Sequence, residues 1–483
     1  MSKASAFLKR VLYAMGANLL SLVASVLTTL IVPKFFGDNV EQYGYLQIYL
    51  FYSGYIGFFH LGWCDGIFLR DGGKRYEDLN RPLYSSQFWL LNAVQLVLAA
   101  LIVLGGFLFT DSADYRFICF AVALSIIIYI PRTMLSYFLQ TTNRIKEYAS
   151  ITTVGRSVYG VSLILIILFF SKSYTHFIWG DLIGKTCAML VSVWWCRDIV
   201  FSKPAKLSVA IPEAGRNISV GIKLMFANIA SMLITGIVRW GIQREWDVAT
   251  YAKISFTLSV SNLLLTFISA VALVLYPTLR RTPQERAAGI YPIMRNALMV
   301  PAFGCLIVYY PIELVLSLWL PQYAESMRYM AILFPMCIYA AQLSLLTQTY
   351  MNVFRMEKKT LQVNLIGVIF AAVTTGISVF WLKNLTLAML SMVVNQMFRC
   401  IYAELVLSKR MGISVLRDIL LESALTVVFI CANWFVGAWI GVGIYVVAYL
   451  IYILFKRRDV TATLAFFRNM KGNREEQTEN GTN

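Results

Sequence analysis

Fourteen apolar stretches fill nearly all of this 483-residue chain, and each is long enough to cross a lipid bilayer. The composition agrees, because 59% of the residues are hydrophobic and only 14% are charged, whereas a soluble domain carries about 25% charged residues. Because a soluble core cannot absorb this much apolar surface, we predict an all-α polytopic membrane protein. The predicted spans are residues 11–32, 43–62, 86–109, 115–140, 149–170, 175–196, 217–238, 250–276, 293–316, 328–350, 361–381, 385–407, 418–437 and 439–456.

The basic residues predict which side of the membrane each connection faces. Of the 42 Lys and Arg, 29 fall on the side of the two termini, seven on the other side and six within spans. Because basic connections are retained in the cytoplasm, both termini are predicted to be cytoplasmic. The net charge of +17 is thus distributed by membrane side and does not gather on a soluble surface, so no nucleic-acid partner is predicted.

Other residue patterns exclude further classes of site. The eight cysteines are dispersed without a CxxC pair and the chain has two histidines, so neither a disulfide framework nor a metal site is predicted. The nucleotide-binding pattern GxxxxGK[ST] is absent, so ATP hydrolysis by this chain is not expected. We predict no cofactor.

An internal repeat predicts the architecture. Residues 23–32 and 229–238 are identical at six of ten positions, and four residues near the end of the fourth span are repeated 208 positions later. Six spans separate the copies, so both halves have the same topology, related by an axis along the membrane normal. Two such six-helix lobes imply a central cleft that opens to alternate sides as the lobes rock.

The repeat also divides the chain into predicted parts. The N-lobe is predicted at residues 1–200 and the C-lobe at 201–410. Two C-terminal helices outside the repeat fall in 411–456, and the polar residues 457–483 are predicted to form a disordered cytoplasmic tail.

The chain resembles the multidrug, oligosaccharidyl-lipid and polysaccharide (MOP) exporter superfamily, and within it the bacterial polysaccharide (O-antigen type) flippases. The 6+6 repeat, the two additional helices, residues 61–70 (LGWCDGIFLR) and residues 140–148 (QTTNRIKEY) carry the resemblance, which covers most of residues 7–456. It implies a transporter and not an enzyme, located in the bacterial inner membrane. The implied cargo is a polyprenyl-diphosphate-linked oligosaccharide of polysaccharide or lipopolysaccharide biosynthesis, and the implied partners are membrane lipids, a polysaccharide polymerase and the chain-length machinery.

Charged residues within the spans predict where the cargo binds. A charge at the centre of a bilayer costs about 2.5–3.5 kcal/mol on insertion scales, so such residues usually face a wet cavity or a partner. Basic residues outnumber acidic ones there, which suits an anionic head group such as a diphosphate. The predicted cationic cleft consists of Arg132, Arg156, Lys185, Lys223 and Arg399. For Arg156 and Lys223, snorkelling to the interface is the alternative interpretation.

Two further groups are candidate sites. Asp181 and Lys185 stand one turn apart near the middle of a span, spaced to pair on one helix face. Asp181 is a candidate ion-coupling carboxylate, and the alternative is that the pair only neutralises itself for insertion. The segment after the second span, with Asp65 and Arg70, is a candidate cytoplasmic entry loop for a diphosphate. A plain turn between helices is the alternative.

Three function classes remain. A lipid-linked oligosaccharide flippase fits the resemblance and the cationic spans. A cation-coupled drug exporter on the same fold is the second, and it is expected to need buried carboxylates instead. A membrane polysaccharide polymerase is the third, but such enzymes commonly carry a large external loop with acidic residues, and the longest external connection here has about a dozen residues.

Overall fold

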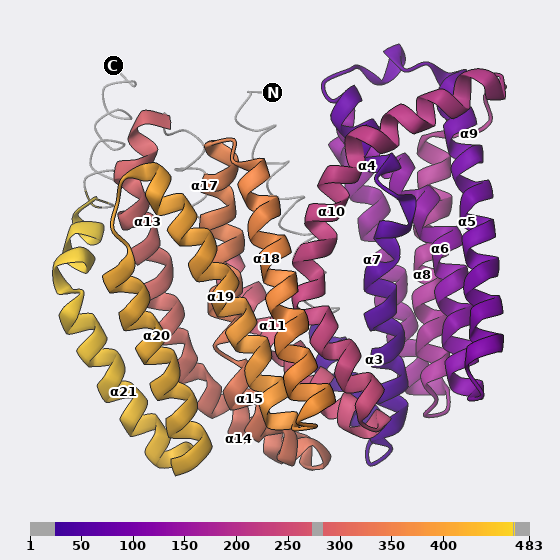
Figure 1. The fold of residues 1–483 in the computed structure, drawn as a ribbon. Helices are drawn as coiled ribbons and strands as arrows, with labels where there is room; N and C mark the ends of the chain where they lie inside the picture. Colours follow the sequence, from indigo (N-terminus) through magenta and orange to yellow (C-terminus); the bar gives the residue numbers. More distant parts are fainter. Residues whose placement is uncertain (1–24, 273–283, 467, 469–483) are drawn as a thin grey trace, which may run out of the picture. The chain divides into compact units, whose positions relative to one another are not determined.

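The regular structure of this protein is helical throughout the residues that the computed structural model describes, which are 25–272, 284–466 and 468 (Figure 1). Ten of these helices are long and apolar enough to cross a membrane, or twelve spans if each of two bent helix pairs is one span. The predicted all-α, multi-pass architecture is therefore confirmed, with ten to twelve spans in the described residues compared with the fourteen predicted. The first predicted span, 11–32, lies mostly outside them.

The chain forms two compact units. Unit 1 consists of Met1–Ile229 and Asp247–Ser255, and unit 2 of Ala230–Trp246 and Phe256–Asn483. The division falls within helices α10 (Leu207–Glu245) and α11 (Val248–Ala272), so each of these helices begins in unit 1 and ends in unit 2.

Unit 1 is built from long helices joined by short connections (Figure 1). Besides the first parts of α10 and α11, its helices are η1 (Leu27–Ile31), α2 (Val32–Phe36), α3 (Val40–Tyr55), η2 (Ile56–His60), α4 (Trp63–Asp71), η3 (Tyr76–Asp78), α5 (Arg81–Phe109), α6 (Ala113–Thr141), α7 (Ile145–Phe169), α8 (Tyr174–Trp195) and α9 (Arg197–Val200).

Unit 2 has more breaks in its helices. Its elements after α11 are α13 (Gln284–Gly304), η4 (Cys305–Val308), α14 (Tyr309–Trp319), η5 (Pro321–Tyr323), α15 (Ala324–Leu333), α16 (Met336–Ala341), η6 (Gln342–Thr347), α17 (Gln348–Val353), α18 (Glu357–Thr375), η7 (Gly376–Trp381), α19 (Leu385–Met411), α20 (Leu416–Cys431), η8 (Ala432–Val436) and α21 (Ala438–Phe455). The predicted span 328–350 bends by 49° between Leu333 and Met336, where Pro335 cannot donate the helical hydrogen bond.

Glycines allow the helices of unit 1 to approach closely. A Cβ atom on Gly184 of α8 would lie 2.9 Å from the carbonyl oxygen of Gly155 on α7. A Cβ atom on Gly66 of α4 would lie only 1.9 Å from the carbonyl oxygen of Asn217 on α10. Both contacts bring backbone against backbone, which any larger residue would prevent.

The C-terminal end differs from the prediction. Residues Arg457–Phe466 are helical and bend by 68° from the preceding helix, and Lys456 is fully buried. The predicted disordered tail therefore cannot begin at residue 457, because this segment continues the helical structure. Residues 469–483 lie outside the described residues.

Candidate functional site

A cavity of about 490 Å³ lies within unit 1, between α6, α7 and α8. The residues that line it recur three or four positions apart, so each helix presents one face to the cavity. On α6 these residues run from Tyr129 to Gln140, and on α7 from Tyr148 to Tyr159. Gly155 and Gly184 also line the cavity, and because neither has a side chain, their close contact leaves room for the larger side chains beside them.

Three of the five predicted cleft residues line this cavity, one from each helix. Arg132 lies nine residues from the last residue of α6, Arg156 eleven residues from the first of α7, and Lys185 ten residues from the last of α8. At 1.5 Å per residue, all three lie about 14–17 Å from the helix ends on the side predicted to be cytoplasmic. The three cations, which we call the cation level, therefore stand at similar depth.

Two residues of the cation level have no anionic partner. Arg132 stacks on the ring of Tyr129, with its Cζ 4.6 Å from the ring centroid, and its buried Nε has no hydrogen-bond partner among the described residues. Neither Arg132 nor Arg156 forms an ion pair with any residue that the structure describes. Asp181 is the one carboxylate among the described residues that line the cavity, so positive charge exceeds negative charge there.

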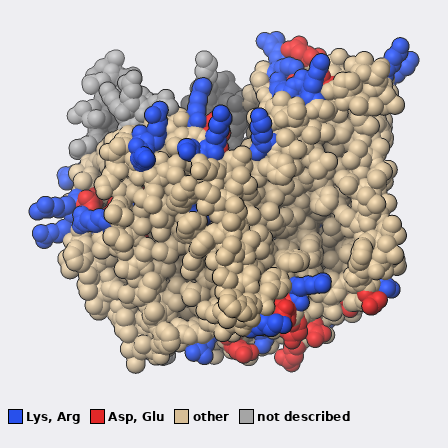
Figure 2. Space-filling model, viewed as in Figure 1, with Lys and Arg blue, Asp and Glu red and all other residues tan. Residues whose placement is uncertain are grey.

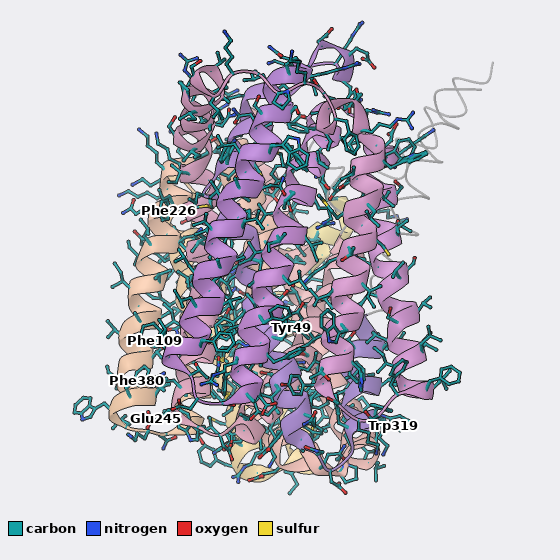
Figure 3. The ribbon with its side chains drawn as sticks, turned by 90° about the vertical axis from the view of Figure 1, so that its right-hand side faces the viewer. Tyr49, Phe109, Phe226, Glu245, Trp319 and Phe380 are labelled. Atoms are coloured by element: carbon teal, nitrogen blue, oxygen red, sulfur yellow. The ribbon has the colours of Figure 1, made fainter. Side chains whose placement is uncertain are left out.

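Asp181 and Lys185 form the predicted pair on α8, with 2.6 Å between Lys185 Nζ and Asp181 Oδ2. Tyr49 of α3 donates its hydroxyl to Asp181 at 2.6 Å, and Lys185 donates to Ser53 Oγ at 2.7 Å. Tyr49 also lies 2.9 Å from Ser125 Oγ, and in Figure 3 it is seen among the helices of unit 1. Because Lys185 has its own carboxylate, its net contribution to the cavity charge is smaller than that of the two arginines.

The other two predicted cleft residues lie elsewhere. Lys223 is exposed on α10 and does not line the cavity. Arg399 is buried in unit 2 on α19, where its Nε donates to Asn364 Oδ1 at 3.1 Å and its Nη2 to Ser231 Oγ at 2.7 Å. Both partners of Arg399 are neutral.

The predicted entry loop is a short helix, α4, and not a plain turn. Leu61 and Gly62 precede it with φ of +54° and +79°, and Gly66 packs its backbone on α10. Asp65 lies 3.4 Å from the hydroxyl of Tyr137, a cavity residue, and 3.8 Å from His60 Nε2. Burial raises the pKa of Asp65 to about 6.

Arg70, the other predicted entry residue, is engaged with α10. It forms an ion pair with Glu213 at 2.7 Å and donates to Asn217. Nearby, Arg81 pairs with Asp198 at 3.3 Å. Figure 2 shows the resulting mixture of basic and acidic side chains over the end of unit 1 that carries α4 and α9. The guanidinium of Arg70 therefore already has acidic and amide partners.

Sequence analysis missed a buried ionic cluster in unit 2. Arg295 stands near the start of the predicted span 293–316 but was not counted among the basic residues within spans; it lies within α13 and is 1% exposed. Its guanidinium contacts Glu404 of α19 at 2.5 Å and Glu422 of α20 at 2.6 Å. Lys456 contacts Asp418 of α20 at 3.2 Å. The two glutamates are buried and fully paired, and their position within predicted spans was the signal that a cation had to lie close by.

No protein-family model and no curated protein matches the sequence. Among solved structures, the chain is similar to the lipid II flippase MurJ in an inward closed conformation, with 13% identity, a TM-score of 0.65, and coverage of 93% of this chain and 100% of that chain. It is also similar to an inward-facing multidrug resistance MATE family transporter of the MOP superfamily, with 10% identity, a TM-score of 0.60, and coverage of 80% and 94%. The chain therefore has the fold that the MurJ flippase shares with MATE transporters of the MOP superfamily.

Proposed function

We propose that this protein is a flippase that moves a polyprenyl-diphosphate-linked oligosaccharide from the cytoplasmic to the outer leaflet of a bacterial inner membrane by alternating access. The observation that carries the proposal is the cation level of Arg132, Arg156 and Lys185 in the unit 1 cavity. Unpaired charge at this depth is costly unless a ligand compensates it. The likeness to a lipid II flippase supports cargo that is linked to a lipid.

The two ends of such a cargo have different expected locations, the polar head group in the cavity and the lipid tail in the bilayer. Arginine guanidinium groups bind phosphate oxygens through two parallel hydrogen bonds, so Arg132 and Arg156 suit the diphosphate. The polyprenyl tail stays in the bilayer, because each CH₂ group removed from an apolar environment costs about 0.8 kcal/mol. Only the polar head group then has to pass through the protein, which lowers the barrier that a bilayer presents to it.

Asp181 is the proposed coupling residue. A diphosphate close to Lys185 competes with Asp181 for the same ammonium group, since the two residues line the same cavity and are 2.6 Å apart. An anion that withdraws Lys185 leaves the carboxylate beside Tyr49 without its cationic partner, so that a coupling cation can take the place of the ammonium group. If Asp181→Asn left transport equally dependent on the proton and sodium gradients, this role would be wrong.

Export of organic cations is the second candidate, and the similarity to a multidrug transporter favours it. The charge of the cavity opposes it, because a cationic drug would meet Arg132 and Arg156 with Asp181 already engaged by Lys185. The flippase proposal, in contrast, includes a role in polysaccharide or O-antigen assembly, with the polymerase and the chain-length machinery as functional partners.

The test is the amount of polyprenyl-diphosphate-linked glycan on the cytoplasmic leaflet of cells that lack this protein. We expect accumulation on deletion, rescue by the wild type, and no rescue by Arg132→Ala with Arg156→Ala at equal expression. Lys223→Ala is the matched control, because Lys223 is basic, exposed and outside the cavity, and it should rescue fully. Full rescue by the double variant, or retention of cationic dyes as the only phenotype of deletion, would contradict the proposal.

A further inference from the structure

Between the cation level and the nearer helix ends, the cavity is lined by neutral side chains, most of them polar or aromatic. We call this part the vestibule. It consists of Ser136, Tyr137, Gln140, Tyr148 and Thr152. Gln140 is one residue from the end of α6 and Thr152 is seven residues from the start of α7, so the vestibule lies about 2–11 Å from the helix ends. The four charged residues among the lining all lie deeper.

Two vestibule side chains, those of Gln140 and Tyr148, are half-buried and available to a ligand. The side chains of Gln140 and Tyr148 form no hydrogen bond with any residue in the described part of the chain. An amide and a phenol that line a cavity without such a partner can bind a polar ligand there.

Tyr137 is held in place from outside the cavity. Helix α4 contacts it twice, through the carboxylate of Asp65 at 3.4 Å and through the ring of Phe68, whose centroid is 5.4 Å from that of Tyr137. A ring that is fixed before the ligand arrives loses little conformational entropy on binding. Tyr137 therefore forms a rigid wall beside the more adaptable Gln140 and Tyr148.

The vestibule has the chemistry of a sugar site. Amide and hydroxyl groups donate to and accept from sugar hydroxyls, and aromatic rings cover the apolar faces of sugar rings. A volume of about 490 Å³ lies within the range of about 300–1,000 Å³ that holds a single small molecule. Since the diphosphate occupies the part of this volume at the cation level, the rest accommodates the sugar next to the diphosphate and not an entire oligosaccharide.

We propose that the vestibule recognises the sugar attached directly to the diphosphate, and that Gln140 and Tyr148 thereby select which glycan the protein accepts. This inference rests on the proposed function, because it takes the cation level as the site of the diphosphate. It adds a second determinant of substrate specificity, because the vestibule recognises the sugar whereas the cation level recognises the charge of the diphosphate.

The test compares binding of two probes to the purified full-length protein in lipid nanodiscs. One probe is a short-chain polyprenyl diphosphate, and the other is the same lipid with one sugar on the diphosphate, prepared with N-acetylglucosamine and, separately, with galactose. We expect the wild type to bind at least one sugar-bearing probe about 10-fold or more tightly than the bare diphosphate, which corresponds to one or two hydrogen bonds. Gln140→Ala with Tyr148→Ala should reduce this ratio to about 1 while affinity for the bare diphosphate changes less than about 2-fold.

Matched controls separate this inference from the proposed function. Gln362→Ala with Tyr402→Ala removes the same two residue types from α18 and α19, outside the cavity, and should leave the ratio unchanged. Arg132→Ala should weaken binding of all probes equally, and if it does not, the proposed site of the diphosphate is wrong whatever the vestibule does. A wild-type ratio near 1 for both sugars, or a ratio that the vestibule variant retains, would overturn the inference. Only variants with the thermal stability of the wild type are compared. Gln140→Glu provides a second, conservative change that should also lower the ratio of the two affinities.

Discussion

Replacing Arg295 by methionine should destabilise unit 2 more than any other single substitution of a basic residue described here. Arg295 donates to Glu404 at 2.5 and 3.2 Å and to Glu422 at 2.6 and 2.8 Å, and these side chains are 1–3% exposed. Without the guanidinium, two buried carboxylates face each other, with Lys456 3.9 Å from Glu422 as the remaining cation.

The magnitude follows from this geometry. Removing one partner of a buried ion pair costs about 3–5 kcal/mol, because the remaining charge is left without compensation. At roughly 2–4 °C per kcal/mol for a chain larger than a small domain, the apparent Tm should fall by about 6–20 °C. Helices α20 and α21 should loosen first, because Glu422 and Lys456 hold them to α13 through this cluster.

The assay is thermal unfolding of the detergent-purified protein, monitored by loss of helical signal and by size exclusion after heating. A matched variant combines Arg295→Met with Glu404→Gln and Glu422→Gln, which removes the uncompensated charges together with the cation. It should recover at least half of the lost Tm, since neutral replacement of a whole buried ion network is often close to neutral in stability. An Arg295→Met protein within about 2 °C of the wild-type Tm, or a triple variant no better than the single one, would refute the reasoning.

Three further outcomes are expected. Gly66→Ala should lower Tm, because its Cβ would lie 1.9 Å from the Asn217 carbonyl oxygen, whereas Gly215→Ala on the exposed side of α10 should leave Tm equal or raise it. Asp65→Asn should be more stable than the wild type at pH 7.5. Since burial raises the pKa of Asp65 to about 6, the folded wild type favours the protonated carboxyl group. The stability of the wild type is therefore fully present below about pH 4 and falls as the pH rises through 6, so the difference in Tm between the two proteins should vanish near pH 4. Asp181→Asn should abolish the dependence of transport on the ion gradient, measured in reconstituted vesicles with and without it.

The periodic features of the fold could be predicted from sequence. Apolar runs longer than about 18 residues specify spans, because the bilayer leaves few other structures available to them. The similar depth of the three residues of the cation level could also have been predicted, by counting residues from each predicted helix end. The stripe of cavity residues on α6, from Tyr129 to Gln140, also follows helical spacing.

Contacts between distant segments could not be predicted. Arg295 lies 109 residues from Glu404 and 127 from Glu422, and no local pattern connects them. Arg295 stands near the start of the predicted span 293–316, next to a basic connection, and only the packing of α13 shows that it is buried. Similarly, a plain turn was the alternative interpretation of the segment with Asp65 and Arg70, whereas the structure forms α4 there and uses Gly66 for its close approach to α10.

Transport by the purified protein in liposomes tests the central claim most directly. A fluorescent polyprenyl-diphosphate sugar is placed in both leaflets, and the fraction accessible to an external quencher or enzyme is followed after the protein and an ion gradient are supplied. The account predicts movement between leaflets with the wild type and with Lys223→Ala, and a loss of at least about 10-fold in rate with Arg132→Gln plus Arg156→Gln. A wild-type rate equal to that of protein-free liposomes, or an undiminished rate in the double variant, would contradict it.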